Sequence, residues 1–216
     1  VLDGEGISLV SARIEGVEIQ SVIENNQLTF PTVPQHDFKL EIVQACNPQA
    51  NTALSGLYVS NNVFCTQMEA EGFRRFAFMQ DRPDVMATYR VRVEASQELS
   101  VLLSNGNRVA SGSIGSDRHF VEWEDPHPKP TYLFALVAGN LASAHDRFTT
   151  SEGRDVSLGI YVERGKEDRC AWAMDCLKAS MRWDEERFGR AYDLDVFNIV
   201  AVSDFNMGAM ENKGLN

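Results

Sequence analysis

One carboxylate, Glu211, lies in the last ten residues of the chain among small and flexible neighbours. This stretch, Met207–Asn216, follows closely on the apolar run Val196–Val202, whose β-branched residues predict a buried strand. Gly208 and Ala209 keep the backbone bare where that strand ends, so an extended peptide could pair with it while Glu211 accepts a positive charge. Considered alone, however, a single glutamate is more often a solvated surface residue.

A second polar segment, Thr66–Arg75, contains an amide and two acids, at Gln67, Glu69 and Glu71. By itself this pattern predicts a polar loop that leads into a strand, with its acidic side chains in solvent. Nothing in its spacing alone indicates a site.

Both segments resemble one known family. The run Gly208-Ala209-Met210-Glu211-Asn212 is similar to the signature of the M1 family of zinc aminopeptidases. The segment Thr66–Arg75 resembles the bacterial aminopeptidase N branch of that family. Four more stretches resemble the same branch: Asp81–Val85, Leu103–Asn107, Tyr132–Gly139 and Trp183–Gly189. The likeness covers most of the chain and implies removal of amino-terminal residues from peptides. Glycine usually replaces Ala209 in the epoxide-hydrolysing branch, so Ala209 disfavours that alternative.

The resemblance implies that Gln67, Glu69 and Glu211 bind the amino terminus of a peptide substrate. Two carboxylates around one ammonium group share its charge, and their mutual repulsion in the empty site is relieved on binding. Charge-assisted hydrogen bonds of this kind are strong and directional. A mid-chain peptide segment has no free amine, so it would leave the carboxylates unpaired, and the site would favour exopeptidase action.

The other expected substrate-binding residues are the neighbours of that glutamate in the signature. The resemblance implies that the backbone of Gly208 and Ala209 bonds the substrate main chain, as in strand addition. Met207 and Met210 are expected to form a pliable wall for a varied side chain, because methionine adapts to many shapes. Ordinary core filling is the alternative for both methionines, and it is the stronger one for Met210. Asn212 completes the set.

The zinc site that the family requires is not found in this sequence. The family places His-Glu-x-x-His on a helix, with a further Glu and a Tyr, whereas this chain has no His-Glu pair. The four histidines are scattered, at His36, His119, His127 and His145. We therefore expect zinc in the parent enzyme but no catalytic residue, metal ligand or hydrolysis in this chain alone. A non-catalytic, β-rich binding module of the same fold is the alternative.

The elements that must position these residues are mostly strands over the first two-thirds of the chain. Alternating apolar and charged residues at 36–42 and 89–94 predict strands with one solvated face. Further strands are predicted at 7–14, 17–23, 27–33, 54–59, 73–79, 99–104, 118–123 and 132–138. Turn signals separate them at Asp81–Asp84, Asn105–Asn107 and Pro126–Pro130. Many short strands at this spacing favour an antiparallel sandwich or saddle-shaped sheet.

The pattern changes near residue 140. A strand at 156–162 precedes a helix over Glu167–Phe188, which Asp168 is expected to cap and Gly189 to end. The strand at 196–202 follows. We expect residues 1–140 to form an antiparallel β-saddle or sandwich domain that lacks its first strands. Residues 141–216 would begin an α+β, thermolysin-like catalytic domain, too short to close a core with two strands and one helix.

The composition of the chain limits the classes of partner that it is expected to bind. The net charge of −11 argues against nucleic acid and suits cationic ligands such as a peptide amino terminus. No apolar run is long enough to span a bilayer, so no membrane partner is expected. The four cysteines, Cys46, Cys65, Cys170 and Cys176, match no usual zinc spacing and favour reduced, buried thiols in a cytoplasmic protein. We expect more chain before Val1 and after Asn216, and self-association through the apolar face this leaves exposed.

Overall fold

The computed structural model describes residues 1–216 and consists mainly of strands in antiparallel sheets, as the sequence predicts. The strands are β1 Leu2–Asp3, β2 Ser8–Ile14, β3 Val17–Glu18, β4 Val22–Glu24, β5 Gln27–Thr29, β6 Leu40–Ala45, β7 Gly56–Ser60, β8 Val63–Gln67, β9 Ala87–Ser96, β10 Val101–Ser104, β11 Asn107–Ile114, β12 Arg118–Lys129, β13 Leu136–Gly139, β14 Leu141–Thr149, β15 Asp155–Glu163 and β16 Val196–Val200. The helices are α1 Cys170–Phe188 and the short 3-10 helices η1 Pro48–Ala50, η2 Phe73–Arg75, η3 Thr131–Leu133 and η4 Glu167–Arg169.

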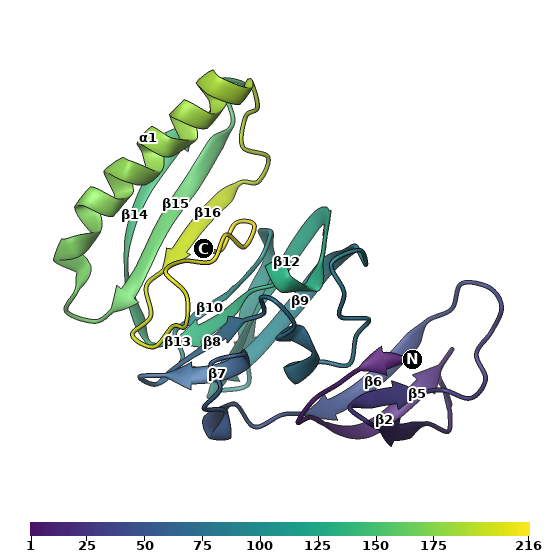
Figure 1. Ribbon diagram of the computed structural model, residues 1–216. Coiled ribbons are helices and arrows are strands. Elements are labelled where there is room, and N and C mark those ends of the chain that lie inside the picture. Colours follow the sequence, from purple (N-terminus) through teal and green to yellow (C-terminus); the bar gives the residue numbers. More distant parts are fainter.

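Two small sheets form the amino-terminal end of the molecule, β3-β2-β6 and β1-β5-β4 (Figure 1). The predicted strand at 17–23 is divided there, because β3 pairs with β2 whereas β4 pairs with β5 in the other sheet. The predicted strand at 36–42 begins only at Leu40 and runs to Ala45 along β2. The second difference is a shift at an element end, where sequence patterns are least informative.

The middle of the chain holds a four-stranded sheet, β10-β13-β8-β7, and the long ribbon β11-β12-β9. The turn expected at Pro126–Pro130 is wrong, because β12 continues to Lys129. Its pairing with β9 jumps from Asp125 to Lys129, and β11 begins, at Asn107, opposite Glu124. The two prolines at 126 and 128 therefore lie where no ladder hydrogen bond is required of them, which is where strands tolerate proline.

The strand expected at 73–79 is also wrong, since this segment contains η2 and then irregular backbone. Phe73 is buried against Phe134, with ring centroids 5.3 Å apart, and Phe76 stacks on the same ring at 5.5 Å. Two aromatic residues three positions apart thus pack on one partner, which requires a helical turn. The alternation of a strand would place them on opposite faces.

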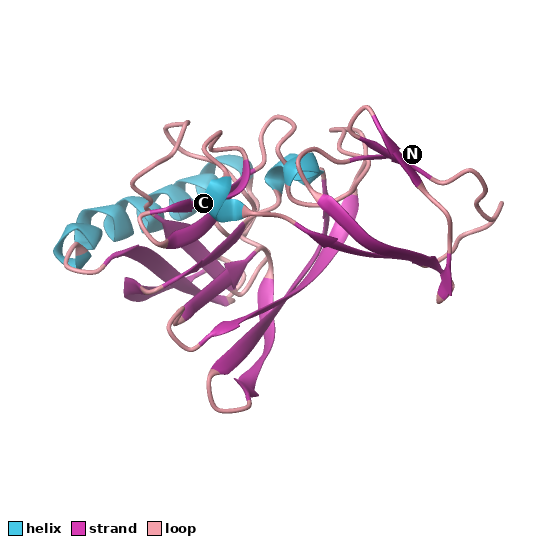
Figure 2. Ribbon diagram, turned by 90° about the horizontal axis from the view of Figure 1, so that it is seen from below, coloured by secondary structure: helices cyan, strands magenta, loops and turns pink.

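The carboxyl-terminal layer is a sheet of β14, β15 and β16 with α1 lying along one face (Figures 1 and 2). A cluster of ten buried residues fills the space between them, among them Val156, Leu158, Met174, Leu177 and Met181. The expectation that this part has only two strands and cannot close a core is wrong, because β14 supplies a third strand. The division of the chain into domains near residue 140 stays a prediction.

The ends of α1 agree only in part with the predicted signals. Gly189 ends the helix with a left-handed φ of 62°, and its N–H donates to the carbonyl of Glu185. Asp168 is not the cap, because it lies inside η4 and the helix begins after Arg169 without a side-chain cap. Cys65 and Cys170 are buried, so the expectation of buried thiols holds there, but it fails at Cys46, which is half-buried, and at Cys176, which is exposed. None of the helices is long and apolar enough to cross a membrane.

Candidate functional site

The segment that carries Glu211 is a loop that leaves β16 and returns to it. The N–H of Asn198 donates to the carbonyl of Gly214 at 3.0 Å, and the N–H of Asn216 donates to the carbonyl of Asn198 at 2.9 Å. Leu215 is consequently bridged to β16 in the parallel sense. The residues between β16 and Gly214 form an irregular loop, whose position depends on what holds it at each end.

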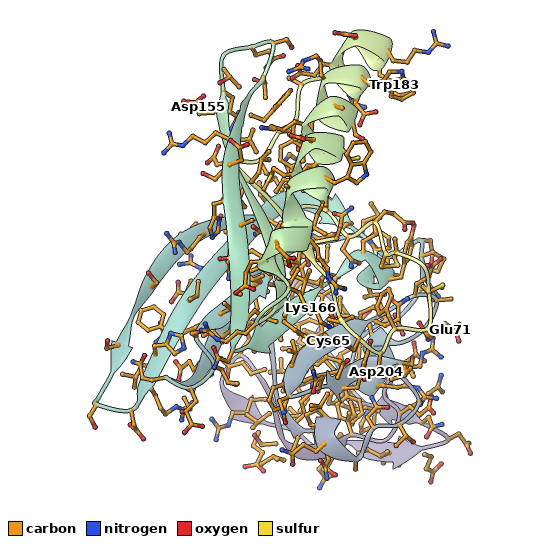
Figure 3. All side chains as sticks on the ribbon, turned by 90° about the vertical axis from the view of Figure 1, so that its left-hand side faces the viewer. Cys65, Glu71, Asp155, Lys166, Trp183 and Asp204 are labelled. Carbon is orange, nitrogen blue, oxygen red and sulfur yellow. The ribbon has the colours of Figure 1, made fainter.

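The first tether of this loop is Asp204. Its carbonyl accepts from the hydroxyl of Tyr58 at 2.9 Å, and its carboxylate accepts from the hydroxyl of Ser60, also at 2.9 Å. The N–H of Asp204 in turn donates to Ser60 Oγ at 2.9 Å. Figure 3 labels Asp204 near Cys65, and Cys65 is paired with Tyr58 across the strands β8 and β7. Burial raises the pKa of the Cys65 thiol to about 11. The loop is therefore attached to strands about 140 positions earlier in the sequence.

The second tether is Asn105, which is almost completely buried at 1% exposure. Its Oδ1 accepts from the N–H of Ala135 at 2.7 Å, and its Nδ2 donates to the carbonyls of Leu133 and Lys213 at 3.0 Å each. All the hydrogen bonds that this amide needs are thus made within the chain. One of them holds the end of the loop against β10 and β13, so the loop is fixed at both ends.

Between the tethers lies a cavity of about 620 Å³. Met207, Gly208, Ala209, Met210 and Asn212 line it on the loop side. The opposite wall consists of Cys65 and Thr66 from β8, Val137 from β13, and Ala135, which directly precedes β13. Five of the eight expected substrate-binding residues are thus brought together around one hollow of mainly apolar lining, a usual form for a ligand pocket.

The two methionines of this loop differ in their surroundings. Met207 is 42% exposed, whereas Met210 is buried at 3%. A Cβ at Gly208 would meet nothing within 4 Å, so the space beside its backbone is open. An extended chain could therefore lie against Gly208, while Met210 already has the packing of a core residue.

Gln67 is the unusual polar residue beside this cavity. It ends β8 next to Thr66, its side chain is 0% exposed, and neither its Oε1 nor its Nε2 has a hydrogen-bond partner. The Oδ1 of Asn212, at 6% exposure, is likewise unpartnered. Buried amides are nearly always hydrogen-bonded, and each exception needs an explanation. Gln67 and Asn212 are residues that the sequence analysis had already selected.

The two acidic residues of the expected site, Glu69 and Glu211, are less buried than Gln67. Glu69 is half-buried and Glu211 is exposed, and neither lines the cavity, nor does Gln67. The backbone after Glu69 is held by Arg74, whose N–H and Nε both donate to the buried carboxylate of Asp81 at 3.1 Å. The convergence of Gln67, Glu69 and Glu211 on one ammonium group stays a prediction.

Comparison with known proteins identifies the family. A model of the peptidase M1 N-terminal domain matches residues 8–133, more than half of the chain, and the peptidase family M1 domain matches residues 172–216. The chain belongs to the peptidase M1 family. The first match contains Gln67 and Glu69, and the second contains the whole loop from Met207 to Asn212.

Curated relatives and a solved structure agree with this M1 assignment. The chain is 53% identical to aminopeptidase N of Caulobacter vibrioides and 52% identical to aminopeptidase N of Escherichia coli, in each case over 100% of the chain and 25% of the relative. The crystal structure of Legionella pneumophila aminopeptidase A in complex with aspartic acid matches with a TM-score of 0.94 at 36% identity, over 100% of this chain and 26% of that one. This M1 chain thus spans about a quarter of the length of these relatives.

Whether this chain holds a metal ion is a separate point from its family. No three histidine, cysteine, aspartate or glutamate side chains of this M1 chain lie together as a group that could hold a metal ion. No chemical step through zinc is assigned to these residues.

Sequence reasoning missed the residues that hold the site in place. Asn105 falls in a stretch that resembles the family, but an Asn-Gly pair indicates only a turn. Asp204, Tyr58 and Ser60 carry no local signal, because their hydrogen bonds join segments that are far apart in the sequence. Such contacts become visible only in the folded chain.

Proposed function

We propose that this chain is the amino-terminal portion of a zinc aminopeptidase that removes single residues from the amino termini of peptides. Its part in that reaction is to hold the substrate amine through Gln67, Glu69 and Glu211. The observation that carries this proposal is the buried amide of Gln67 without a partner, at the end of the strand whose Cys65 and Thr66 line the cavity opposite Met207–Met210. Leaving such a group unpaired costs about 1–3 kcal/mol, a cost that a ligand can offset by bonding to it.

The open backbone at Gly208 supports strand addition by the substrate. A peptide that pairs there would direct its amino terminus away from the apolar cavity and toward polar groups at its rim. Glu211 is adjacent in sequence to Met210, which lines the cavity, and Glu69 follows Thr66 of the opposite wall by three positions. Because the Gln67 side chain is completely buried, its Oε1 can contact an ammonium group only after a neighbouring segment shifts.

The proposal also covers the parts of the parent enzyme that are not in this chain. The family implies zinc, which polarises a carbonyl and activates water. We infer that its ligands belong to other residues of the parent, because this chain contains no His-Glu pair. The isolated chain would accordingly bind peptides without hydrolysing them. We further propose a β-saddle domain over 1–140, the start of the catalytic domain over 141–216, a cytoplasmic location, and no nucleic-acid or membrane partner.

Self-association of the isolated chain is part of the same proposal. Trp172 is 78% exposed, Trp183 is 56% exposed and Phe188 is 62% exposed on α1. Figure 3 labels Trp183 on the outer side of this helix, away from the strands. Trp183 and Phe188 pack edge to face, with ring centroids 5.5 Å apart, and exposed aromatic side chains of this kind favour pairing of copies at high concentration. Light scattering that shows a monomer at every concentration would contradict this part.

The experiment is a comparison of two peptides that differ only at the amino terminus. Trialanine and its acetylated form are titrated into the chain, and binding is followed by amide chemical shifts. We expect saturable binding of the free-amine peptide and at least tenfold weaker binding of the acetylated one, because a charge-assisted hydrogen bond is worth about 1.5–3 kcal/mol. Equal binding of the two peptides would refute the proposal.

Variants assign the effect to named residues. Glu69→Gln and Glu211→Gln are each expected to weaken trialanine binding roughly tenfold, by the same magnitude of about 1.5 kcal/mol or more. Glu71→Gln is the matched control, because Glu71 lies in the same segment but its side chain is 68% exposed and faces Arg74. Equal losses in Glu71→Gln and Glu69→Gln would show that only the overall charge matters.

A further inference from the structure

A second cavity, of about 340 Å³, lies on the face of the β14–β15–β16 sheet that α1 does not cover. Its walls come from this sheet on one side and from β10, β11 and β12 on the other. It shares no lining residue with the cavity beside Met207–Met210. Its volume is at the lower end of the range of about 300–1,000 Å³ that is usual for small-molecule sites.

The floor of this cavity is a notch in the sheet. His145, Gly159 and Asn198 stand directly opposite one another on three adjacent strands, so they face the same side of the sheet. Gly159 leaves a gap between the two polar side chains. A Cβ there would come within 2.7 Å of Asn198 Oδ1 and within 2.8 Å of the ring of Tyr161. The absence of a side chain at Gly159 therefore allows the Asn198 amide to occupy its position.

The polar groups of the notch are available to a ligand. Asn198 is 95% removed from solvent, at 5% exposure, yet its side-chain amide makes no hydrogen bond within the chain, and it lines the cavity. Unlike the amide of Gln67, the amide of Asn198 is not sealed off, so a ligand in the cavity can bond to it. His145 bonds to Ser143 through Nε2 at 2.8 Å and packs edge-on against Tyr161.

Charge makes this cavity unusual in so acidic a chain. None of its lining residues is Asp or Glu, although the chain has 31 of them and a net charge of −11. It does include Arg108, which is exposed and takes part in no ion pair. Burial raises the pKa of Tyr161, and the nearby positive charge of Arg108 opposes that rise. The cavities along α1, in contrast, include acids such as Asp175 and Asp193.

From this geometry we propose that the notch is a binding site for a small carboxylate with an apolar body. The guanidinium of Arg108 takes the carboxylate, the amide of Asn198 donates a hydrogen bond, and the apolar body packs against Val101, Leu103 and Trp123. A free amino acid fits less well, because no lining carboxylate can pair with its ammonium group. The site is distinct from the peptide site proposed above and does not depend on it.

The test uses three probes of the same shape on the 216-residue chain. Phenylacetate carries the carboxylate, phenylacetamide is its neutral analogue, and phenethylamine is the cation. We expect saturable shifts of the Gly159 and Asn198 amides with phenylacetate, and at least tenfold weaker binding of the other two. Absence of saturable binding up to 20 mM phenylacetate, on the order of the weakest specific affinities, would overturn the proposal, as would equal binding of phenylacetamide.

Variants distinguish this site from a general attraction of anions. Arg108→Gln is expected to weaken phenylacetate binding at least tenfold, and Gly159→Ala to weaken it by closing the notch. Arg13→Gln is the matched control, because Arg13 is also exposed and free of ion pairs but lies on β2. Equal losses in Arg13→Gln and Arg108→Gln would overturn the assignment. Glu211→Gln should leave phenylacetate binding unchanged, so failure of the peptide site and of this site can be told apart.

Discussion

Replacing Gln67 by Met is expected to stabilise the fold while weakening peptide binding. Methionine is unbranched and of similar length, but it has no amide to leave unpaired. Both amide atoms of Gln67 are without partners at 0% exposure. Burying an unpaired amide costs about 1–3 kcal/mol in proteins. We therefore expect Gln67→Met to raise the free energy of unfolding by about 2 kcal/mol, because that cost disappears.

The assay is urea unfolding together with a thermal melt. A gain of about 2 kcal/mol corresponds to a rise in Tm of about 4–8 °C for a chain of this size. Gln44→Met is the matched control. The Nε2 of Gln44 donates to the carbonyl of Phe76 at 2.9 Å, and its Oε1 accepts from the N–H of Phe78 at 3.0 Å. The same substitution there should lower stability by about 1–2 kcal/mol, because it leaves two backbone groups unpaired.

The combination of results decides the matter. A stable Gln67→Met variant that no longer distinguishes trialanine from acetylated trialanine would show that the amide is retained for binding at the expense of stability. A variant that is less stable than the wild type would refute the reasoning, since it would mean that the amide has a partner in the folded chain.

Three further predictions follow from the tethers and the turns of the fold. Tyr58→Phe should lower the free energy of unfolding in urea by about 1 kcal/mol, because it removes the hydrogen bond to the Asp204 carbonyl. If protease cleavage of the 204–213 loop is unchanged in this variant, the role of Tyr58 as a tether is contradicted. Glu163 accepts from Lys166 and Ser203, which holds its pKa near about 2, below the ordinary 4.5. The stability that Glu163 contributes should therefore be present above about pH 4.5 and lost as the pH falls to about 2. The difference in Tm between the wild type and Glu163→Gln should shrink over that range. A difference in Tm that stays constant would argue against the ion pair. Gly106→Ala should lose at least about 2 kcal/mol, because φ is +90° and a Cβ would come within 2.2 Å of the Glu124 carbonyl, whereas a wild-type Tm would show that the turn can rearrange.

Much of the fold could be predicted because its signals are local. The alternation at 89–94 identified β9, and Gly189 identified the end of α1. The errors came where tertiary packing decides the local structure. Phe73 and Phe76 share one aromatic partner and therefore form a turn instead of a strand, and the prolines of β12 are tolerated beside an irregular ladder.

The candidate site shows the same division. The loop residues 207–212 were selected from the sequence by family resemblance, and the structure gathers most of them around one cavity. The unpaired state of the Gln67 amide could not be predicted, because it depends on what surrounds that side chain in three dimensions. The notch at Gly159 is equally hidden in the sequence, since it depends on the register of three strands.

The most direct test of the central claim is a crystal structure of the chain with trialanine bound. The account predicts that the peptide amino group lies within hydrogen-bonding distance, about 2.7–3.2 Å, of Gln67 Oε1 and of a carboxylate oxygen of both Glu69 and Glu211. A peptide bound elsewhere, or bound with its amino group in solvent and away from these three side chains, would contradict it.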